Sequence, residues 1–365
     1  MIDIRKTFLA LTTRRYPLGS EDEAMEIVKQ ILPKVKFTKD EFDNYYTYIP
    51  VKSATAKKAA IDSDTMFTAH LDTVNSGKSG FYNGKRWDVG LKKYVEVDEK
   101  EKEDLSITHL FDGDFVKTDG ESNLGADDKA GVTIMMNMIS EKVPGLYYFF
   151  MGEESGCVGS SSLSRKFESI KTFPKINKCI SFDRRGYDSI ITEQTSVCAS
   201  DEFANELADR YKEYGFWFKP DPTGVYTDSA EFTDIIPECS NISCGYFSEH
   251  TKSERQDLEF LELLAIVSTQ IKWETLPIVR DKDKIYKGKK SGYTRTYGWD
   301  WDDGYGGEYY ANINSTKAKS KSKKTKGTSK TFTDNGNGNL TDITSNIDFD
   351  FDKWYGEQKT KSWAD

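Results

Sequence analysis

Several residue types are scarce in this chain, and each scarcity excludes a class of protein. Five cysteines, an odd number without a CxxC pair, exclude a disulfide framework and predict reduced thiols in the cytoplasm. No run of about 18 apolar residues occurs, so no membrane-spanning helix is expected. Residues 1–5 lack the apolar core of a secretory signal. We therefore expect a cytoplasmic protein.

An excess of positive charge is also missing. The net charge of −9 argues against a nucleic-acid-binding body. The exception is a lysine-rich run at 315–326, which contains no acidic residue. That run predicts a flexible, solvated linker, with an anion- or nucleic-acid-binding arm as the alternative. The remainder of 276–365 is rich in aromatic residues and glycine or in Asn-Gly repeats, a composition that predicts disorder.

The first 275 residues have the pattern of one folded domain, in which short apolar strands alternate with helix-like segments. This alternation is typical of α/β proteins. Strands are expected at 65–69, 146–151, 178–182 and 241–247. Helices are expected at 21–32, with Ser20 as its N-cap, and at 127–139, 201–214, 229–235 and 255–273. The polar stretch 76–112 predicts a surface hairpin or loop.

Histidine is the scarcest titratable residue, with three in 365 residues, and two of the three stand beside acidic residues. The candidate site residues are His70, Asp72, Asp127, Glu153, Glu154, Asp183 and His250. Three motifs directly follow predicted strands, where ligands collect in open α/β sheets: His70-Leu71-Asp72, Glu153-Glu154 and Asp183. Asp127 opens a predicted helix, where a carboxylate with both oxygens free can span two ions. Imidazole and carboxylate donors in this arrangement predict a two-metal site.

The motifs around these residues resemble those of the co-catalytic zinc exopeptidases, which include peptidase T, carboxypeptidase G and the aminoacylases. They are His70-Leu71-Asp72, the Gly-Ala-Asp-Asp-Lys-Ala-Gly run at 125–131, Glu153-Glu154, the Phe-Asp-Arg-Arg-Gly run at 182–186 and His250. Residues 112–131 are especially similar to peptidase T. The run 153–160 is similar to single-domain zinc aminopeptidases. The resemblance covers roughly residues 5–273 and implies a mixed, mostly parallel sheet flanked by helices.

The same resemblance implies a role for each candidate residue. One metal ion would be held by His70 and Asp183, the other by Glu154 and His250, with Asp127 bridging them. Glu153 would be the general base, and Asp72 would hold the second ring nitrogen of His70. The Asp127–Asp128 peptide would be cis. Zinc is favoured by these mixed donors, although cobalt or manganese would also fit.

One departure from peptidase T concerns the lid. Two-domain relatives insert a lid domain between the equivalents of Asp183 and His250, whereas only sixty-six residues lie between them here. We therefore expect a lidless, single-domain form without a lid-mediated dimer. Tyr226 or Tyr246 would replace the lid histidine as an oxyanion donor. Arg184 and Arg185 could bind a substrate carboxylate, but orienting Asp183 or pairing at the surface would explain them as well.

The expected activity is metal-dependent hydrolysis of short peptides, by an aminopeptidase or tripeptidase that uses a metal-activated water. A carboxypeptidase or an N-acyl-amino-acid deacylase on the same scaffold is the first alternative, so the substrate would be a short peptide or an acyl amino acid. A glutaminyl-cyclase-like acyltransferase with one zinc is the second alternative. The third is a non-catalytic scaffold with a basic tail.

Overall fold

The structure is a computed structural model that describes residues 1–51, 63–74 and 106–284, together with the backbone of three short strands. These are β4 (Phe81–Tyr82), β5 (Lys85–Asp88) and β6 (Lys93–Glu96), which form an antiparallel sheet. They lie in the polar stretch for which a hairpin or loop was expected. Disorder was predicted for residues 276–365, of which residues 285–365 lie outside the described ranges.

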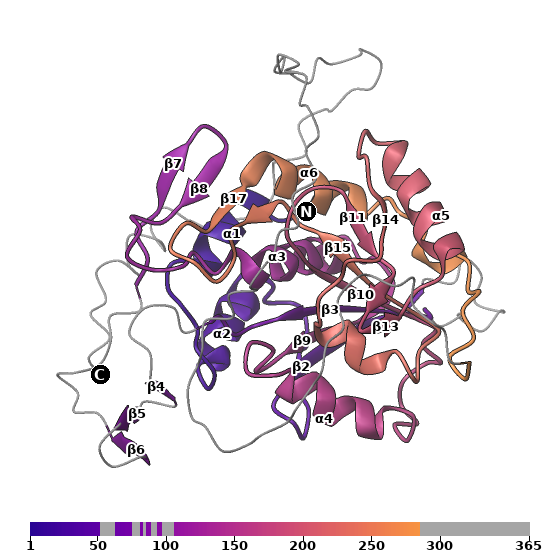
Figure 1. Cartoon of the computed structure of the whole chain (residues 1–365), viewed down its shortest axis with the longest axis horizontal. Helices are drawn as coiled ribbons and strands as arrows, with labels where there is room; N and C mark the ends of the chain where they lie inside the picture. The colour runs from indigo at the N-terminus through magenta and orange to yellow at the C-terminus, as the bar shows by residue number, and fades with distance from the viewer. Residues whose placement is uncertain (52–62, 75–80, 83–84, 89–92, 97–105, 285–365) are drawn as a thin grey trace, which may run out of the picture. The chain divides into compact units, whose positions relative to one another are not determined.

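Eight of the described strands form one mixed sheet in the order β1-β2-β9-β3-β10-β15-β11-β14 (Figure 1). Their bounds are β1 (Thr38–Lys39), β2 (Tyr45–Ile49), β9 (Gly145–Phe150), β3 (Thr65–His70), β10 (Lys178–Arg184), β15 (Glu238–Ser243), β11 (Ser189–Ile191) and β14 (Lys219–Asp221). The central strands β9, β3, β10 and β15 run parallel, with antiparallel β2 and β11 beside them. This confirms the expected α/β fold with a mixed, mostly parallel sheet.

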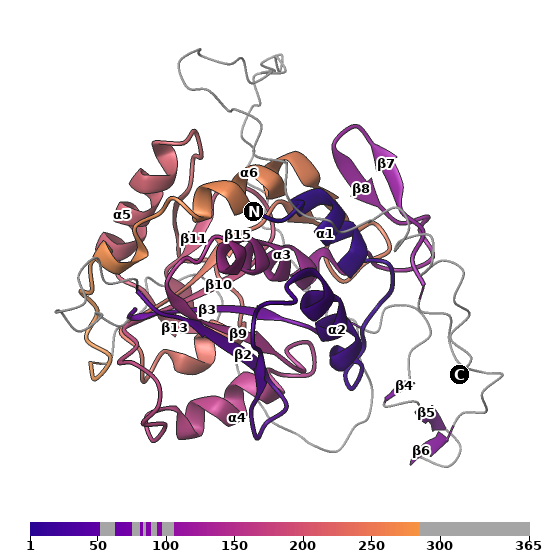
Figure 2. The ribbon, with the colours of Figure 1, turned by 180° about the vertical axis from the view of Figure 1, so that it is seen from behind.

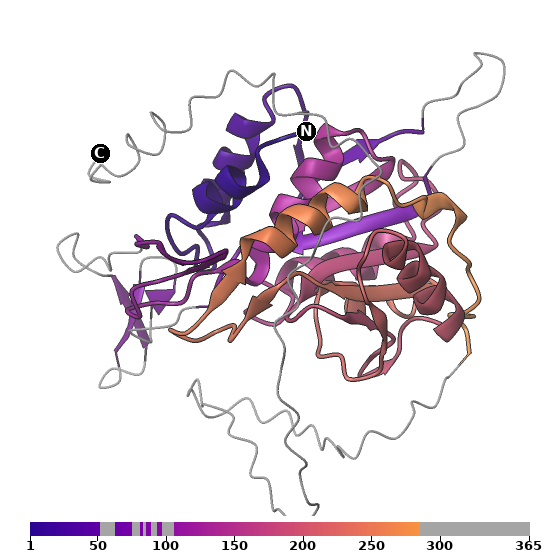
Figure 3. The same ribbon diagram turned by 90° about the horizontal axis from the view of Figure 1, so that it is seen from above.

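Helices cover both faces of this sheet. Figure 1 shows α3 (Ala126–Ser140) and α6 (Leu258–Ser268) on one face and α4 (Val158–Phe167) on the other. On the α3 side, α1 (Ile4–Leu11) and α2 (Glu21–Ile31) complete the layer (Figures 2 and 3). The 3-10 helix η2 (Asp228–Phe232) packs against α4, and α5 (Asp201–Lys212) packs against β11 and β14.

Side chains of the central strands alternate between these two layers. Phe67 and Ile180 belong to the core under α3, whereas Met66 and Cys179 belong to the core under α4. All residues of β3, β9 and β15 are buried. Strands of a parallel sheet that is covered on both faces are largely apolar, as β9 is, although β15 also buries Glu238, Ser240 and Asn241.

One expected strand is in fact two. Residues 241–247 end β15 and then form β16 (Tyr246–Phe247), which belongs to a separate sheet in the order β16-β17-β8-β7. The chain turns at Gly245, whose φ is +83°. A Cβ atom at Gly245 would lie 2.5 Å from Cδ1 of Phe260. Glycine is therefore required at this turn, and the expectation of a continuous strand was wrong.

The expected helix at 255–273 is wrong at both ends, because the helix found there spans only Leu258–Ser268. Residues 255–257 form strand β17 (Arg255–Asp257), which pairs with β8 (Phe115–Lys117), and β8 pairs with β7 (Leu110–Asp112). Helix α6 begins only at Leu258, where the Asp257 carboxylate accepts a hydrogen bond from the Phe260 N–H at 3.0 Å. The 3-10 helix η3 (Trp273–Thr275) follows α6. Apolar periodicity alone did not separate the strand from the helix.

The other expected helices agree more closely with the structure. Those at 21–32, 127–139 and 201–214 correspond to α2, α3 and α5, and the one at 229–235 is the 3-10 helix η2. Ser20 stands at the N-cap position of α2, but its hydroxyl donates to the Pro17 carbonyl at 2.6 Å instead of capping the helix. Helices α1 and α4 were not expected.

The segment between Asp183 and His250 builds the main body. Residues 184–249 are all described, and they supply β11, β14 and β15 of the central sheet, helix α5 and a short hairpin of β12 (Glu193–Gln194) and β13 (Ser196–Val197). They form no lid domain. None of the helices in the described ranges has the length and apolar character needed to cross a bilayer.

The body continues past the predicted division at residue 275, because Trp273 and Leu276 on either side of it are both buried. Glu238 is fully buried and accepts hydrogen bonds from the backbone N–H groups of Val279 at 2.7 Å and Arg280 at 2.8 Å. The buried Arg280 guanidinium donates to the carbonyls of Thr233, Ile236 and Pro237. Residues 276–280 are therefore anchored to the α/β body.

Candidate metal centre

His70 is the last residue of β3, and its imidazole is 1% exposed. Ring atom Nδ1 lies 3.1 Å from the main-chain oxygen of Asp72 and 3.4 Å from its carboxylate. An Nδ1–H that donates to this carbonyl leaves Nε2 as the free ligand atom. Nε2 lies 3.0 Å from Oδ1 of Asp127 and 3.7 Å from Oδ1 of Asp183. The expected Asp72 contact is thus present, but the nearer partner is its carbonyl.

Asp127 lies between the two histidines. Its Oδ1 is 3.0 Å from Nε2 of His70, and its Oδ2 is 3.1 Å from Nε2 of His250. The side chain projects from the start of α3, and the following peptide bond to Asp128 is cis. Each oxygen of one carboxylate therefore faces a different imidazole, which is the arrangement that a bridging ligand needs.

Glu153 and Glu154 follow β9, and the buried carboxylate of Asp72 holds the backbone of both residues in position. Its two oxygens accept the Glu153 N–H at 3.0 Å and the Glu154 N–H at 3.1 Å. Oε1 of Glu154 lies 3.0 Å from Nε2 of His250, whereas Oε2 of Glu153 lies 4.0 Å from Nε2 of His70. Burial raises the pKa of Glu153 well above its ordinary value and that of Glu154 to about 7. The two neighbours therefore occupy different places in the site.

Asp183 stands near the end of β10 and has a partner on each oxygen. Its Oδ1 accepts a hydrogen bond from the Tyr246 hydroxyl at 3.1 Å, and its Oδ2 accepts one from the Thr227 hydroxyl at 2.5 Å. Burial and the nearby charge of Asp127 raise its pKa. Tyr246, one of the two expected oxyanion donors, is therefore engaged with Asp183. The other, Tyr226, donates to Glu231 at 2.8 Å.

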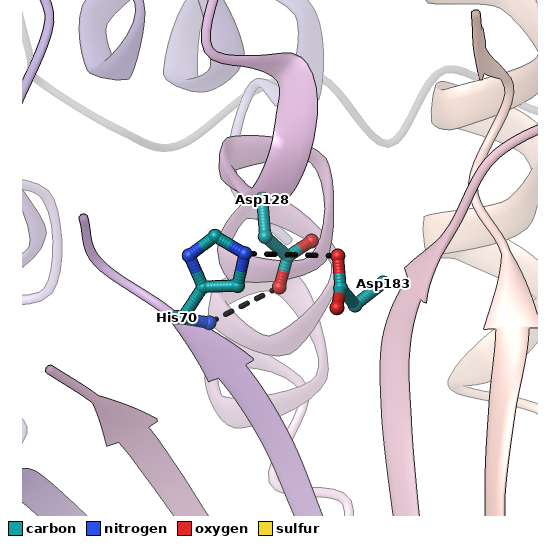
Figure 4. Close-up of side chains that lie close together, drawn as sticks. All are labelled: His70, Asp128 and Asp183. Carbon is teal, nitrogen blue, oxygen red and sulfur yellow. Dashed lines mark hydrogen bonds and ion pairs between the residues drawn. The ribbon is translucent and has the colours of Figure 1, made fainter. Parts of the chain in front are cut away.

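Asp128 is a further carboxylate close to His70 and Asp183. Figure 4 shows His70 at the end of β3, Asp183 on β10, and Asp128 reaching them from the first turn of α3. Oδ2 of Asp128 accepts the His70 N–H at 3.1 Å, and Oδ1 accepts the Gly131 N–H at 3.0 Å. Both Asp128 oxygens thus accept backbone N–H groups, one of them from His70 itself, so Asp128 helps to hold the His70 backbone in place.

His250 completes the second half of the site from a loop. Its imidazole is 49% exposed, and its φ of +62° lies in the left-handed region. Burial alone would lower the pKa of His250, but the contacts with Asp127 and Glu154 raise it to about 12. Ligand atoms of these three residues all lie within 4.8 Å of one another. All seven predicted site residues are thus brought together.

The donor set fits two divalent cations. Four carboxylates, from Asp127, Glu153, Glu154 and Asp183, converge on only two imidazoles. Buried like charges repel each other unless a cation lies between them. Lys129 supplies one positive charge nearby, since its fully buried ammonium donates to the Asp72 carbonyl at 3.2 Å. Mixed imidazole and carboxylate donors are the ligands that Zn²⁺ takes in catalytic sites.

Sequence reasoning missed the role of Glu254. Its fully buried carboxylate accepts the N–H groups of Leu124 and Gly125 at 2.8 Å each through Oε2, and that of Asp127 at 3.0 Å through Oε1. A side chain whose partners are backbone N–H groups distant in sequence leaves no pattern that could identify it. Its place four residues after His250 was the only available signal.

The two arginines after Asp183 have partners outside the metal centre. Arg184 lies 3.8 Å from the Asp221 carboxylate and donates to the Thr223 carbonyl at 3.3 Å. Arg185 is exposed and pairs with Glu249 at 2.8 Å. Three interpretations of Arg184 and Arg185 were open: binding a substrate carboxylate, orienting Asp183, or pairing at the surface. These contacts match pairing with neighbouring polar groups.

Known proteins share the fold of this chain. No family model matches the sequence. The uncharacterized protein YqjE of Bacillus subtilis (strain 168) is 34% identical over 116 residues, a match that spans 30% of this chain and only 24% of YqjE. Aminopeptidase PepT from Bacillus cereus ATCC 10987 superimposes with a TM-score of 0.56 at 15% identity, covering 75% of this chain and 99% of PepT. The chain shares its fold with this aminopeptidase.

Two further solved structures support this assignment of fold. A tripeptidase from Staphylococcus aureus subsp. aureus Mu50 has a TM-score of 0.53 at 14% identity, with 74% of this chain and 98% of the tripeptidase covered. The TET1 peptidase of Pyrococcus horikoshii has a TM-score of 0.52 at 15% identity, with 73% and 98% covered. At such identities the likeness establishes the architecture, and the activity has to be argued from the site.

Proposed function

We propose that this chain is a metal-dependent exopeptidase that hydrolyses short peptides, as an aminopeptidase or a tripeptidase. The observation that carries the proposal is the position of Asp127, whose two oxygens face two different imidazoles. Each imidazole has a second carboxylate beside it, Asp183 for His70 and Glu154 for His250. The aminopeptidase fold supports the same activity.

In this proposal His70 and Asp183 hold one divalent ion, Glu154 and His250 hold the other, and Asp127 contacts both. Zinc suits the donors best. When bound, the ions would lower the pKa of a water molecule and polarise the scissile carbonyl. The chain's own contribution is to fix the five ligands, which it does through β3, β10, the start of α3 and the loops around Glu154 and His250.

Glu153 is the proposed general base. Its side chain lies within 4.0 Å of His70 but makes no closer ion pair among the described residues. Burial raises its pKa, which makes the carboxylate a stronger base toward the attacking water, and the acid formed can return the proton to the leaving amine. The N–H groups of Glu153 and Glu154 are both held by Asp72, which keeps the base and the neighbouring ligand at a fixed separation.

The proposal is tested by assaying the full chain, loaded with Zn²⁺, on three substrate sets. These are di- and tripeptides with a free amine, the same peptides with a blocked amine, and N-acyl amino acids. We expect cleavage of the free-amine peptides only, with turnover lowered by a factor of about 10²–10⁴ in Glu153→Gln. Preferential cleavage of blocked peptides or acyl amino acids would instead favour the carboxypeptidase or deacylase. No hydrolysis of any set by metal-loaded protein would contradict the proposal.

A further inference from the structure

A single buried carboxylate organises the turn that carries the bridging residue. The Glu254 side chain is 1% exposed, and its oxygens accept the N–H groups of Leu124, Gly125 and Asp127. These groups precede or begin α3, where N–H groups have no partner within the helix. A carboxylate at this position supplies the missing acceptor and is favoured by the helix dipole. The backbone of Asp127 is thus fixed by a residue more than a hundred positions away in sequence.

Glu254 also ends the loop that carries His250. It lies four residues after His250 and directly before β17, which pairs with β8. Within the loop, Ser248 and His250 both have left-handed φ values, +58° and +62°. Because the His250 ring is 49% exposed, packing against it is limited, and its position depends on how the loop ends are held. Glu254 holds one end against the Asp127 turn.

We infer that Glu254 is a positioning residue that sets His250 and Asp127 relative to each other and so shapes the half of the metal centre that contains Glu154. This inference rests on the metal-dependent function proposed above. Glu254 touches no reacting atom in the structure. It acts through the backbone of Asp127 and through the loop that carries His250. Oδ2 of Asp127 and Nε2 of His250 lie 3.1 Å apart.

The other half of the centre does not depend on Glu254 in the same way. His70 is fixed at the end of β3 with its Nδ1 beside the Asp72 carbonyl. Asp183 is held on β10 by Tyr246 and Thr227. Loss of the Glu254 carboxylate should therefore weaken the ion beside His250 more than the ion beside His70.

The test is Glu254→Gln, which keeps the side-chain shape but replaces one acceptor oxygen with an NH₂ group. Glu238→Gln is the matched control, because the Glu238 carboxylate is also fully buried and accepts the N–H groups of Ser200, Val279 and Arg280. None of those donors belongs to a candidate ligand. His250→Ala provides the reference for loss of one specific ion.

Each full-length protein is titrated with Zn²⁺ and then with Co²⁺, whose absorption spectrum reports its ligands. For Glu254→Gln we expect one ion to bind as in the wild type and the second to bind about 10- to 100-fold more weakly. Its cobalt spectrum should resemble that of His250→Ala. Glu238→Gln should bind both ions with wild-type affinity, even if it melts at a lower temperature.

Two results would overturn the inference. One is that Glu254→Gln binds both ions with wild-type affinity. The other is that Glu254→Gln and Glu238→Gln lose affinity for both ions to the same extent. If the wild type bound no ion, the proposed function would fail, and amide hydrogen exchange at 124–127 would then decide. Faster exchange in Glu254→Gln than in Glu238→Gln would support the positioning role of Glu254, whereas equal exchange would refute it.

Discussion

Removing the chain after residue 275 should destabilise the folded body strongly, whereas removing it after residue 284 should not. The difference lies in nine residues that include Leu276 and Arg280, both buried. Glu238 accepts two N–H groups from this segment, at 2.7 and 2.8 Å. A cut after 275 would leave the fully buried Glu238 carboxylate with Ser200 as its remaining hydrogen-bonding partner.

The size of the effect follows from these contacts. Hydrogen bonds to a charged group contribute about 1.5–3 kcal/mol each, so losing two costs about 3–6 kcal/mol. Loss of the buried Leu276 side chain removes about 1.5–3 kcal/mol more of hydrophobic stabilisation. The total of about 5 kcal/mol or more matches the lower end of the stability of a typical domain, about 5–15 kcal/mol. At about 2–4 °C per kcal/mol, we expect Tm to fall by about 10 °C or more.

Thermal unfolding followed by circular dichroism would measure both truncated chains beside the full chain. Arg280→Met in the full chain isolates the guanidinium, whose loss leaves the carbonyls of Thr233, Ile236 and Pro237 without that donor. The Arg280→Met variant should also have a lower Tm than the full chain. Equal melting temperatures for the cuts after 275 and 284 would refute the reasoning, because the anchored segment would then contribute nothing to stability.

Glu153→Gln should retain metal while turnover falls by a factor of about 10²–10⁴, whereas Glu154→Gln should weaken the ion beside His250. Metal analysis showing the reverse pattern would exchange the two assignments. Adding EDTA should lower Tm, because the buried carboxylates then repel each other without a cation. Adding Zn²⁺ at about 1,000 times its Kd should raise the free energy of unfolding by about 4 kcal/mol. A Tm insensitive to EDTA would argue against bound metal. Arg185→Ala should change kcat/KM less than about twofold, since its exposed pair with Glu249 contributes little. A tenfold rise in KM confined to peptides with a free carboxylate would instead make Arg185 a substrate contact.

The parts of the fold that sequence could predict are those determined by local pattern. Strands β3, β9 and β10 contain mainly apolar, buried residues, so their carboxyl ends, where His70, Glu153 and Asp183 lie, could be predicted. The lidless architecture followed from the short interval before His250. The strands were identified from a few neighbouring residues, and the lidless form from the length of one interval.

The parts that sequence missed depend on contacts between distant segments. The break between β15 and β16 occurs because Phe260 occupies the space beside Gly245. The carboxylate of Asp72 was expected at His70, but it chiefly holds two N–H groups about eighty residues away. Glu254 likewise pairs with backbone groups across the molecule. Hydrogen bonds from side chain to backbone carry no residue preference on the backbone side, so no pattern marks them.

The metal content of the full chain tests the central claim most directly. Protein prepared in metal-replete, chelator-free buffer should carry about two divalent ions per chain by elemental analysis, because five ligands with one bridging carboxylate suit a two-ion site. His70→Ala should reduce that content sharply, since His70 contacts Asp127 and lies beside Asp183. Wild-type protein without bound metal under these conditions would contradict the account.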